Sequence, residues 1–252
     1  NTEQSTYGEN GEQFNDVVYS PYLDVWSMVG TAGSIFVGPG IGTTVFTSVT
    51  SNSIQSINSV AASPEGLIAV GNNNTIRVSA NGQGWTSISI AGVGGQNLNK
   101  VIYRNGTYAI CGSNGTIIGG DSLSNLTKKS TNVSVNFVTI DFEDIFVAID
   151  DGGNVYYSYD LEVWILREIS ELGSNTPNAL MFVNEYGKDG RYVVVGSGST
   201  IIVADQVFNR ATATTSQTAG IVTSITITNG GFGYSQENPP AVLIESPSIK
   251  KE

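Results

Sequence analysis

The segment Gly153-Asn154-Val155-Tyr156-Tyr157-Ser158-Tyr159-Asp160-Leu161-Glu162-Val163-Trp164 recurs in altered form along this chain of 252 residues. One copy runs from Val17 to Trp26 and another from Thr75 to Trp85. In all three copies a serine stands six residues before a tryptophan. The chain is therefore a repeat protein, in which each repeat is one small structural unit that stacks on its neighbours.

The residues between serine and tryptophan predict a tight turn. Asn81 and Asp160 follow their serines by two residues, and short polar side chains there hydrogen-bond the backbone of a turn. The tryptophan then opens the next strand and can pack sideways into a neighbouring unit. We therefore predict these structural repeat positions: Ser20, Trp26, Ser79, Asn81, Trp85, Ser158, Asp160 and Trp164.

A hairpin signature also recurs along the chain. A short apolar run such as Gly66 to Gly71 is followed by a Gly, Asn or Asp turn and a second strand such as Thr75 to Ser79. Counting the N-terminal copy, second strands end at residues 20, 48, 79, 120, 158 and 204. The later spacings match a four-stranded propeller blade, about 40 to 50 residues. A further apolar piece before each hairpin supplies the innermost strand.

The fold class that these patterns predict is all-β, a β-propeller of five to seven blades with six copies visible, followed by a small β module. Residues 1–14 are polar and predict an N-terminal arm or linker, residues 15–216 the propeller repeats, and residues 217–252 a small β-rich module or connector. The N-terminal copy shows only the later strands of a blade. Its missing strands are therefore expected either from residues beyond the propeller, which would close the ring, or from upstream sequence.

Composition restricts the chemistry that the chain can perform. A formal charge of −11 argues against a nucleic-acid or anionic-membrane binder, and no apolar stretch approaches the length of a membrane span. Histidine is absent, which excludes His-based zinc sites and Ser-His or Cys-His nucleophiles. The single cysteine, Cys111, lies in an apolar run and is expected to be a buried small hydrophobe.

Two resemblances to known families add to this interpretation. The Ser-x-Asp/Asn…Trp copies resemble the Asp-box repeats of sialidase-like and related β-propellers, although those repeats place serine seven residues before tryptophan. This resemblance implies structural motifs on blade rims. The segment 223–234, Thr-Ser-Ile-Thr-Ile-Thr-Asn-Gly-Gly-Phe-Gly-Tyr, with Pro239 to Ile244 after it, resembles a short motif of tailed-bacteriophage tail, baseplate and fibre proteins. That resemblance implies a virion exterior.

Candidate catalytic and metal-binding residues do not form a recognisable pattern. A sialidase would need three clustered arginines, and none of the arginines matches a family position: Arg77, Arg104, Arg167, Arg191 and Arg210. Five acidic residues crowd one hairpin, where they could form a carboxylate pair or bind calcium, but turn formation explains them more simply: Asp141, Glu143, Asp144, Asp150 and Asp151. We predict no catalytic residues, no cofactor and no metal.

The expected function is therefore binding and assembly without catalysis, in a tail, fibre or other exterior protein of a tailed-phage virion. Expected partners are other virion subunits, further copies of the chain, or a host surface glycan or protein, with no nucleic acid and no membrane insertion. The expected location is the virion or the extracellular space. One alternative is a secreted sialidase-like or other carbohydrate-active propeller enzyme, which an axial pocket of Arg and carboxylates would favour. Another is a bacterial assembly-factor or adhesin propeller.

Overall fold

The computed structural model describes residues 11–40, 45–142, 145–167, 175–183, 191–205, 212–218 and 221–229. Within these residues the chain is all-β, apart from one short 3-10 turn at Thr31–Gly33. No helix in these ranges is long and apolar enough to cross a membrane. The chain forms two compact units, residues 1–183 with 192–203, and residues 184–191 with 204–252.

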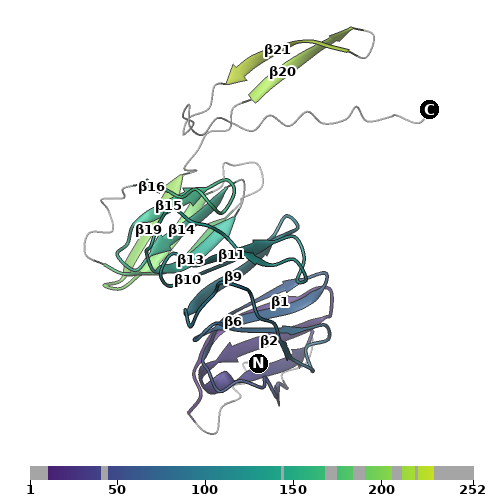
Figure 1. Ribbon diagram of the computed structural model, residues 1–252, viewed down its shortest axis with the longest axis vertical. Helices are drawn as coiled ribbons and strands as arrows, with labels where there is room; N and C mark the ends of the chain where they lie inside the picture. The colour runs from purple at the N-terminus through teal and green to yellow at the C-terminus, as the bar shows by residue number, and fades with distance from the viewer. Residues whose placement is uncertain are drawn as a thin grey trace, which may run out of the picture. The chain divides into compact units, whose positions relative to one another are not determined.

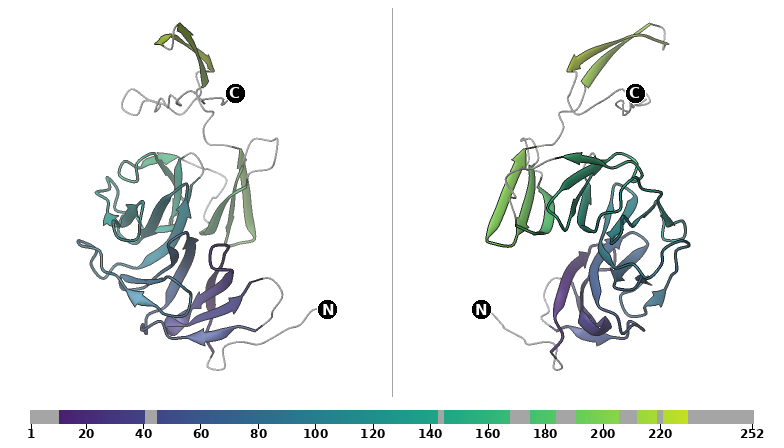
Figure 2. Two further views of the ribbon diagram at one scale, coloured as in Figure 1. Left: turned by 90° about the vertical axis from the view of Figure 1, so that its right-hand side faces the viewer. Right: turned by 60° about the vertical axis from the view of Figure 1, so that its left-hand side comes forward.

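The first unit is a β-propeller of five blades, each an antiparallel meander in which strands that follow one another in the chain are paired (Figures 1 and 2). The first strands of successive blades pack against one another. Within the described residues, four blades have four strands and the fifth has three. The strands of blade 1 are β1 (Phe14–Ser20), β2 (Val25–Gly30), β3 (Ile35–Pro39) and β4 (Thr47–Val49).

The strands of the other blades are as follows. Blade 2 has β5 (Ile57–Ser63), β6 (Gly66–Gly71), β7 (Thr75–Ser79) and β8 (Thr86–Ser87). Blade 3 has β9 (Leu98–Arg104), β10 (Thr107–Gly112), β11 (Ile117–Gly120) and β12 (Thr127–Lys128). Blade 4 has β13 (Phe137–Phe142), β14 (Phe146–Asp150), β15 (Val155–Ser158) and β16 (Ile165–Arg167). Blade 5 has β17 (Pro177–Val183), β18 (Arg191–Gly196) and β19 (Thr200–Asp205).

The hydrophobic core consists of layers between consecutive blades. Ile68, Val70 and Ile76 of blade 2, for example, share a buried cluster with Leu98 and Tyr108 of blade 3. The second strand of an inner blade is covered on both faces, so all residues of β6 and β14 are buried. This double coverage explains why the strands are almost continuously apolar instead of alternating.

A β-bulge recurs at the same place in the first strand of four blades. The pairing of first and second strands skips one residue each time, and the skipped residues are Asn15, Asn58, Asn99 and Val138. A bulge leaves its extra residue outside the ladder and redirects the side chain. Three of the four skipped residues are asparagines, which suggests a shared use for the amide.

The three bulge asparagines form what we call the asparagine ladder (Asn15, Asn58 and Asn99). Each Nδ2 donates to a carbonyl oxygen in the first strand of the next blade, at 2.9, 2.9 and 2.6 Å, the acceptors being Ile57, Leu98 and Phe137. The ladder thus ties blade 1 to 2, 2 to 3 and 3 to 4. Val138 has no amide, so the junction of blades 4 and 5 lacks this bond.

Replacing Val138 by asparagine should therefore extend the ladder to the carbonyl group of Pro177. We expect the free energy of unfolding to rise by about 0.5–1.5 kcal/mol, the usual net value of one hydrogen bond, in urea unfolding. The control is Val138→Leu, which has the shape of asparagine without its amide. A Val138→Asn protein no more stable than the Val138→Leu protein would contradict the prediction.

The first blade departs from the sequence prediction. Val17 to Ser20 belong to β1, the first strand of the blade rather than its third, and the predicted strand ends at residues 20 and 48 both fall in blade 1. Blade 1 is a four-stranded meander of consecutive strands, and no other strand of the described residues joins its sheet. Third strands end at Pro39, Ser79, Gly120, Ser158 and Asp205, so successive blades are offset by 40, 41, 38 and 47 residues. This spacing accounts for five blades, within the predicted range.

The second unit contains a two-stranded hairpin of β20 (Thr212–Thr218) and β21 (Ile221–Asn229). β20 begins before residue 217, so the hairpin crosses the predicted boundary between propeller and module. The end of the phage-like segment, from residue 230, and Pro239 to Ile244 lie outside the described residues. Most of the predicted arm lies outside them too, and its last residue, Phe14, begins β1.

Candidate functional site: a groove on blade 1 and the turns on the blade rims

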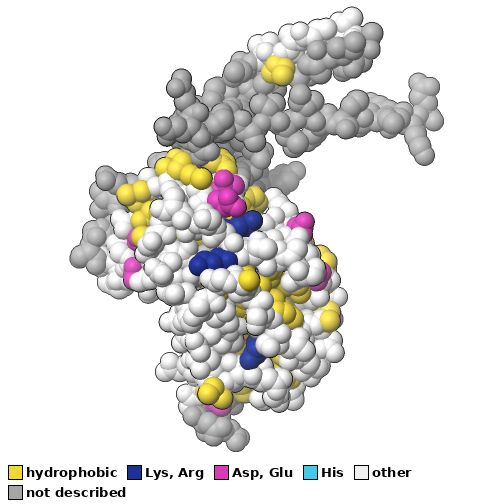
Figure 3. Space-filling view, viewed as in Figure 1, with side chains coloured by type: hydrophobic (Ala, Val, Ile, Leu, Met, Phe, Trp, Pro, Cys, Tyr) yellow, Lys and Arg dark blue, Asp and Glu magenta, His cyan; other side chains and the backbone are white. Residues whose placement is uncertain are grey.

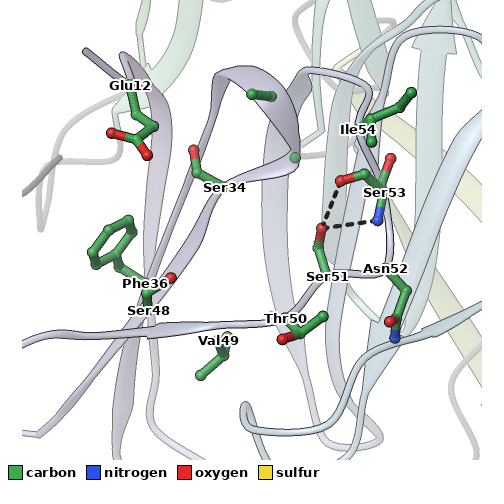
Figure 4. A pocket seen from close by; sticks show the side chains of 12 residues that line it. Glu12, Ser34, Phe36, Ser48, Val49, Thr50, Ser51, Asn52, Ser53 and Ile54 are labelled. Carbon is green, nitrogen blue, oxygen red and sulfur yellow. Dashed lines mark hydrogen bonds between the residues drawn. The ribbon is translucent and has the colours of Figure 1, made fainter. Parts of the chain in front are cut away.

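A groove of about 550 Å3 opens beside blade 1. One part of its lining is the β2–β3 turn with Ser34 and Phe36, and the other is the segment 48–54 that leaves β4 for blade 2. Glu12 lies at its edge, and Figure 4 shows Glu12, Ser34 and Phe36 across the hollow from Ser51 and Ser53. The pairing of β3 with β4, in which Phe36 lies opposite Ser48, brings the two walls together.

The wall made by residues 51–53 is held by local hydrogen bonds. The Ser51 hydroxyl donates to the Ser53 carbonyl oxygen at 3.3 Å and accepts from the Ser53 N–H at 3.2 Å. Asn52 sits in the left-handed region at φ 57°, and its Nδ2 donates to the Trp85 carbonyl oxygen at 3.2 Å. The Arg77 guanidinium donates to the Asn52 carbonyl oxygen at 2.7 Å. The groove wall is therefore anchored to blade 2.

The described lining of this groove offers hydroxyl groups, backbone and an aromatic ring to a ligand. Among the described residues that line it, Glu12 is the only ionisable one, whereas glycoside hydrolysis ordinarily needs two carboxyl groups. The Ser51 hydroxyl bonds only to the backbone of Ser53, and without histidine the chain lacks the usual base that would activate it. Hydroxyl groups, exposed backbone and the Phe36 ring can hold a polar, extended ligand such as a glycan or a peptide.

The predicted turn residues of blades 2 and 4 make the same set of hydrogen bonds. The Ser79 hydroxyl accepts the Gly82 N–H at 2.9 Å, and the Ser158 hydroxyl accepts the Leu161 N–H at 3.0 Å. The side-chain oxygen Oδ1 of Asn81 accepts two backbone N–H groups at 2.9 and 3.0 Å, and Oδ1 of Asp160 accepts two at 2.8 and 2.9 Å. Asparagine and aspartate thus perform one task here, because each offers an acceptor oxygen.

The tryptophans after these turns are buried between blades. Trp85 and Trp164 are each 2% exposed. Trp85 packs with residues of blades 1 and 2, and Trp164 with residues of blades 3 and 4. Each indole N–H donates to a carbonyl oxygen of its own turn, at 3.0 Å to Gly82 and 3.1 Å to Leu161. The indoles are therefore packing residues and present no open ring face to a ligand.

The N-terminal copy occupies another place in its blade. Ser20 ends β1 and Trp26 lies in β2, so the turn between them joins the first and second strands, whereas the other two turns join the third and fourth. Trp26 is 36% exposed and stacks on Tyr19 at a ring distance of 5.1 Å. The spacing of Ser20 and Trp26 matches the other copies, but their structural position does not.

The turn at Asp160 should make stability depend on pH. Burial alone would raise the pKa of Asp160, but the N–H groups of Val163 and Glu162 and the Ser158 hydroxyl outweigh it and hold the pKa below its ordinary value of 3.8. A carboxyl group with a depressed folded-state pKa stabilises the protein above its unfolded pKa and loses that contribution as the pH falls through the folded pKa. Asp160→Asn should therefore lower stability at pH 7, with a difference that shrinks below pH 3.8.

Urea unfolding of the Asp160→Asn protein and the unchanged chain at neutral and acid pH measures this difference. The matched control is Asn81→Asp, which places a carboxylate in the equivalent turn of blade 2. The free energy of unfolding of that variant should fall more steeply in acid than that of the unchanged chain. A deficit in the Asp160→Asn protein that stays constant across the pH range would show that charge plays no part in the turn.

A polar network that the sequence analysis missed joins the first strands of three blades. Asp16 Oδ2 accepts hydrogen bonds from the Ser59 hydroxyl at 2.7 Å and the Val60 N–H at 3.2 Å, and it pairs with Lys100 Nζ at 2.9 Å. Asp16, Ser59 and Lys100 each follow a ladder asparagine directly in the sequence. In the sequence, this network is indicated by an asparagine followed by a polar residue within an otherwise apolar strand. The network stabilises the junctions of blades 1, 2 and 3.

The other residues considered for chemistry lie apart. Arg77 is in β7. Arg104 ends β9, and its Nε lies 3.8 Å from Oδ1 of Asp141. Asp150 accepts the N–H groups of Gly152 and Asn154 within its own turn. The Arg167 side chain and residues 143, 144 and 210 lie outside the described part of the chain. Among the residues described, no three acidic or cysteine side chains come together in a way that could hold a metal ion.

Cys111 is completely buried in the layer between blades 3 and 4, as predicted. Burial away from water raises the pKa of its thiol to about 12. A thiol with such a pKa carries almost no thiolate at neutral pH. Cys111 therefore acts as a small apolar residue of the core.

No family model matches the chain, and no curated protein matches it either. Solved β-propellers are similar in structure. A YCF48 chain bound to a D1 peptide is 17% identical with a TM-score of 0.59, over 77% of this chain and 65% of that one. The WD40 β-propeller domain of Doa1 is 17% identical with a TM-score of 0.59, over 85% and 69%. A chain of a nidogen/laminin complex is 12% identical with a TM-score of 0.59, over 87% and 84%. These similarities establish the β-propeller fold of this chain.

Proposed function

We propose that this chain is a non-enzymatic binding and assembly protein that uses its propeller to hold a polar partner on the exterior of a tailed-phage virion. The observation that carries the proposal is the groove beside blade 1, with its hydroxyl groups, its aromatic ring and its single carboxylate. The partner is a neighbouring virion subunit or a host surface glycan or protein.

The arrangement of charged residues supports binding over hydrolysis. Lys and Arg are scattered rather than clustered on the face seen in Figure 3. Arg77 is engaged with the backbone of Asn52, and Arg104 faces Asp141 in a different blade. The alternative of a sialidase-like or other carbohydrate-active enzyme therefore gains no support from the described arginines.

One further line supports a binding role, and another favours the virion as the setting. Two of the similar propellers are described with a partner, YCF48 with a D1 peptide and a chain of a nidogen/laminin complex. The resemblance of residues 223–234 to a motif of phage tail proteins favours the virion as the setting. β21 covers the first part of that segment.

Blocking the groove tests the binding role. Thr50 lines the groove and is exposed, so Thr50→Trp should fill the hollow without disturbing the core. We expect the unchanged chain to bind members of an array of bacterial surface glycans and surface proteins, and Thr50→Trp to weaken binding about tenfold or more. The control is Thr127→Trp, at an exposed position in β12 of blade 3. Equal binding by both variants would remove the groove from the proposal.

Mass spectrometry of purified particles tests the setting. Peptides of this chain should co-purify with virions through a density gradient and remain attached after washing in salt. A chain recovered only as a free soluble species would overturn the virion assignment. Hydrolysis of glycan substrates by the purified chain would overturn the non-enzymatic role.

A further inference from the structure

The five blades form an arc with two ends. β1 packs against β5, β5 against β9, β9 against β13 and β13 against β17, whereas the described residues of β17 and β1 make no contact of comparable extent. Figure 2 shows blade 5 and blade 1 as the two ends of the series. Among the described strands, every inner blade has a blade on each side, and each end blade has a blade on one side only.

One face of blade 1 exposes residues that are buried in every other blade. Phe14, Val17 and Trp26 are 38%, 52% and 36% exposed. Their equivalents in blade 2, by position relative to the bulge and the strand ends, are Ile57, Val60 and Leu67, at 0%, 4% and 0%. Blade 1 covers these residues of blade 2. We call Phe14, Val17 and Trp26 the leading face.

Blade 5 likewise exposes apolar residues, on the opposite side of its sheet. Met181, Val195 and Ile201 are 57%, 40% and 70% exposed. Their equivalents in blade 3 are Ile102, Cys111 and Ile117, at 7%, 0% and 0%. Blade 4 covers these residues of blade 3. We call Met181, Val195 and Ile201 the trailing face.

The junction of blades 3 and 4 shows how such faces fit together. Ile102, Cys111 and Ile117 share one buried cluster with Phe137, Ile140 and Phe146. The last three are the positions of Phe14, Val17 and Trp26 in blade 4. Aromatic, β-branched and aromatic side chains thus recur in the same order on blade 4 and on the leading face, which makes the leading face a suitable cover for a trailing face.

We infer that the trailing face of one copy binds the leading face of a second copy, so that chains associate head to tail. The contact reproduces a blade junction that the chain already makes four times. Asn178 stands at the ladder position of β17 and is exposed, and it is placed to donate to the Phe14 carbonyl oxygen of the second copy. Because the two faces differ, the contact is heterologous, and it generates a closed ring or an open filament. The inference does not depend on the virion setting.

Disulfide trapping tests the contact with the full chain. Val17 and Met181 occupy the positions of Ile140 and Ile102, which share one cluster, and both are exposed enough to replace safely. A Val17→Cys protein mixed with a Met181→Cys protein should give a disulfide-linked dimer under mild oxidation, whereas each protein alone should give none. Cys111 is buried and serves as the internal control.

Three outcomes would overturn the inference. Dimers of either single variant with itself would indicate a symmetric contact. A cross-link within one molecule of the Val17→Cys/Met181→Cys double variant, with none between molecules, would show that the two ends meet in a closed five-bladed ring. Absence of any cross-link in the mixture would show that the faces do not meet.

Sedimentation of the unchanged chain gives an independent measure. The average mass should rise with protein concentration, and Ile201→Asp should weaken association about tenfold or more by placing a charge in the contact. The control is Val163→Asp, at a site that is 50% exposed and lies on neither face. A mass equal to that of one chain at all concentrations, or equal effects of the two variants, would contradict the inference.

Discussion

Replacing Trp164 by alanine should lower the free energy of unfolding by about 3–5 kcal/mol, the usual loss for a large aromatic residue in a core. The indole is 2% exposed, its ring lies 5.1 Å from that of Phe137, and its N–H donates to the Leu161 carbonyl oxygen. The side chain of Asn132, in the linker before blade 4, accepts a hydrogen bond from the Trp164 N–H and donates one to the Trp164 carbonyl oxygen. Truncation leaves a cavity in the layer between blades 3 and 4.

Urea unfolding followed by tryptophan fluorescence and circular dichroism measures this loss. The matched control is Trp26→Ala, because Trp26 shares the serine spacing but is 36% exposed. At concentrations where the chain is monomeric, that variant should lose less than about 1 kcal/mol, as surface substitutions do. Equal losses from the two variants would mean that the three serine-tryptophan copies are structurally equivalent after all.

Gly33→Ala should lower stability by about 2–4 kcal/mol, since it combines backbone strain with a steric clash. Gly33 has φ +74°, a conformation that L side chains rarely adopt, and an added Cβ would overlap the carbonyl oxygen of Ser53. The clash is with backbone, so no side-chain rotation relieves it. Because Gly33 and Ser53 lie on opposite walls of the groove, the same change should also alter ligand binding.

The control for this variant is Gly94→Ala. Gly94 is exposed, and a Cβ added there meets nothing within 4 Å. In thermal unfolding, the midpoint temperature of Gly33→Ala should lie below that of the unchanged chain. The midpoint temperature of Gly94→Ala should equal it. A Gly33→Ala protein as stable as the control would show that the linker at Ser53 moves away from the β2–β3 turn at little energetic cost.

The all-β class and the propeller could be predicted because hairpin turns and apolar strands recur at blade spacing. The order of strands in blade 1 could not, because first and third strands look alike as short apolar runs. Val17 to Ser20 and Thr75 to Ser79 both end in serine before a turn, yet one is a first strand and the other a third. An asparagine at the bulge position, as at Asn15 and Asn58, is the sequence feature that marks these two first strands.

The groove could not be predicted for a different reason. Its lining is mostly small polar residues from a turn and a linker, Ser34 and residues 48–54, which carry no chemical signature in the sequence. Their proximity follows from the pairing of β3 with β4 and from the hydrogen bonds that hold Asn52 against blade 2. The turns at Ser79 and Ser158 were predictable, since their hydrogen bonds form within a few neighbouring residues.

Each blade is one uninterrupted stretch of chain, and that arrangement has a mechanical consequence. Tension applied along the polypeptide loads the blade junctions in series, so the weakest of them yields first. The junction of blades 4 and 5 lacks the asparagine bond that the three preceding junctions contain. Under load the arc should therefore open from blade 5 and lengthen in blade-sized steps, absorbing a pull gradually instead of breaking at once.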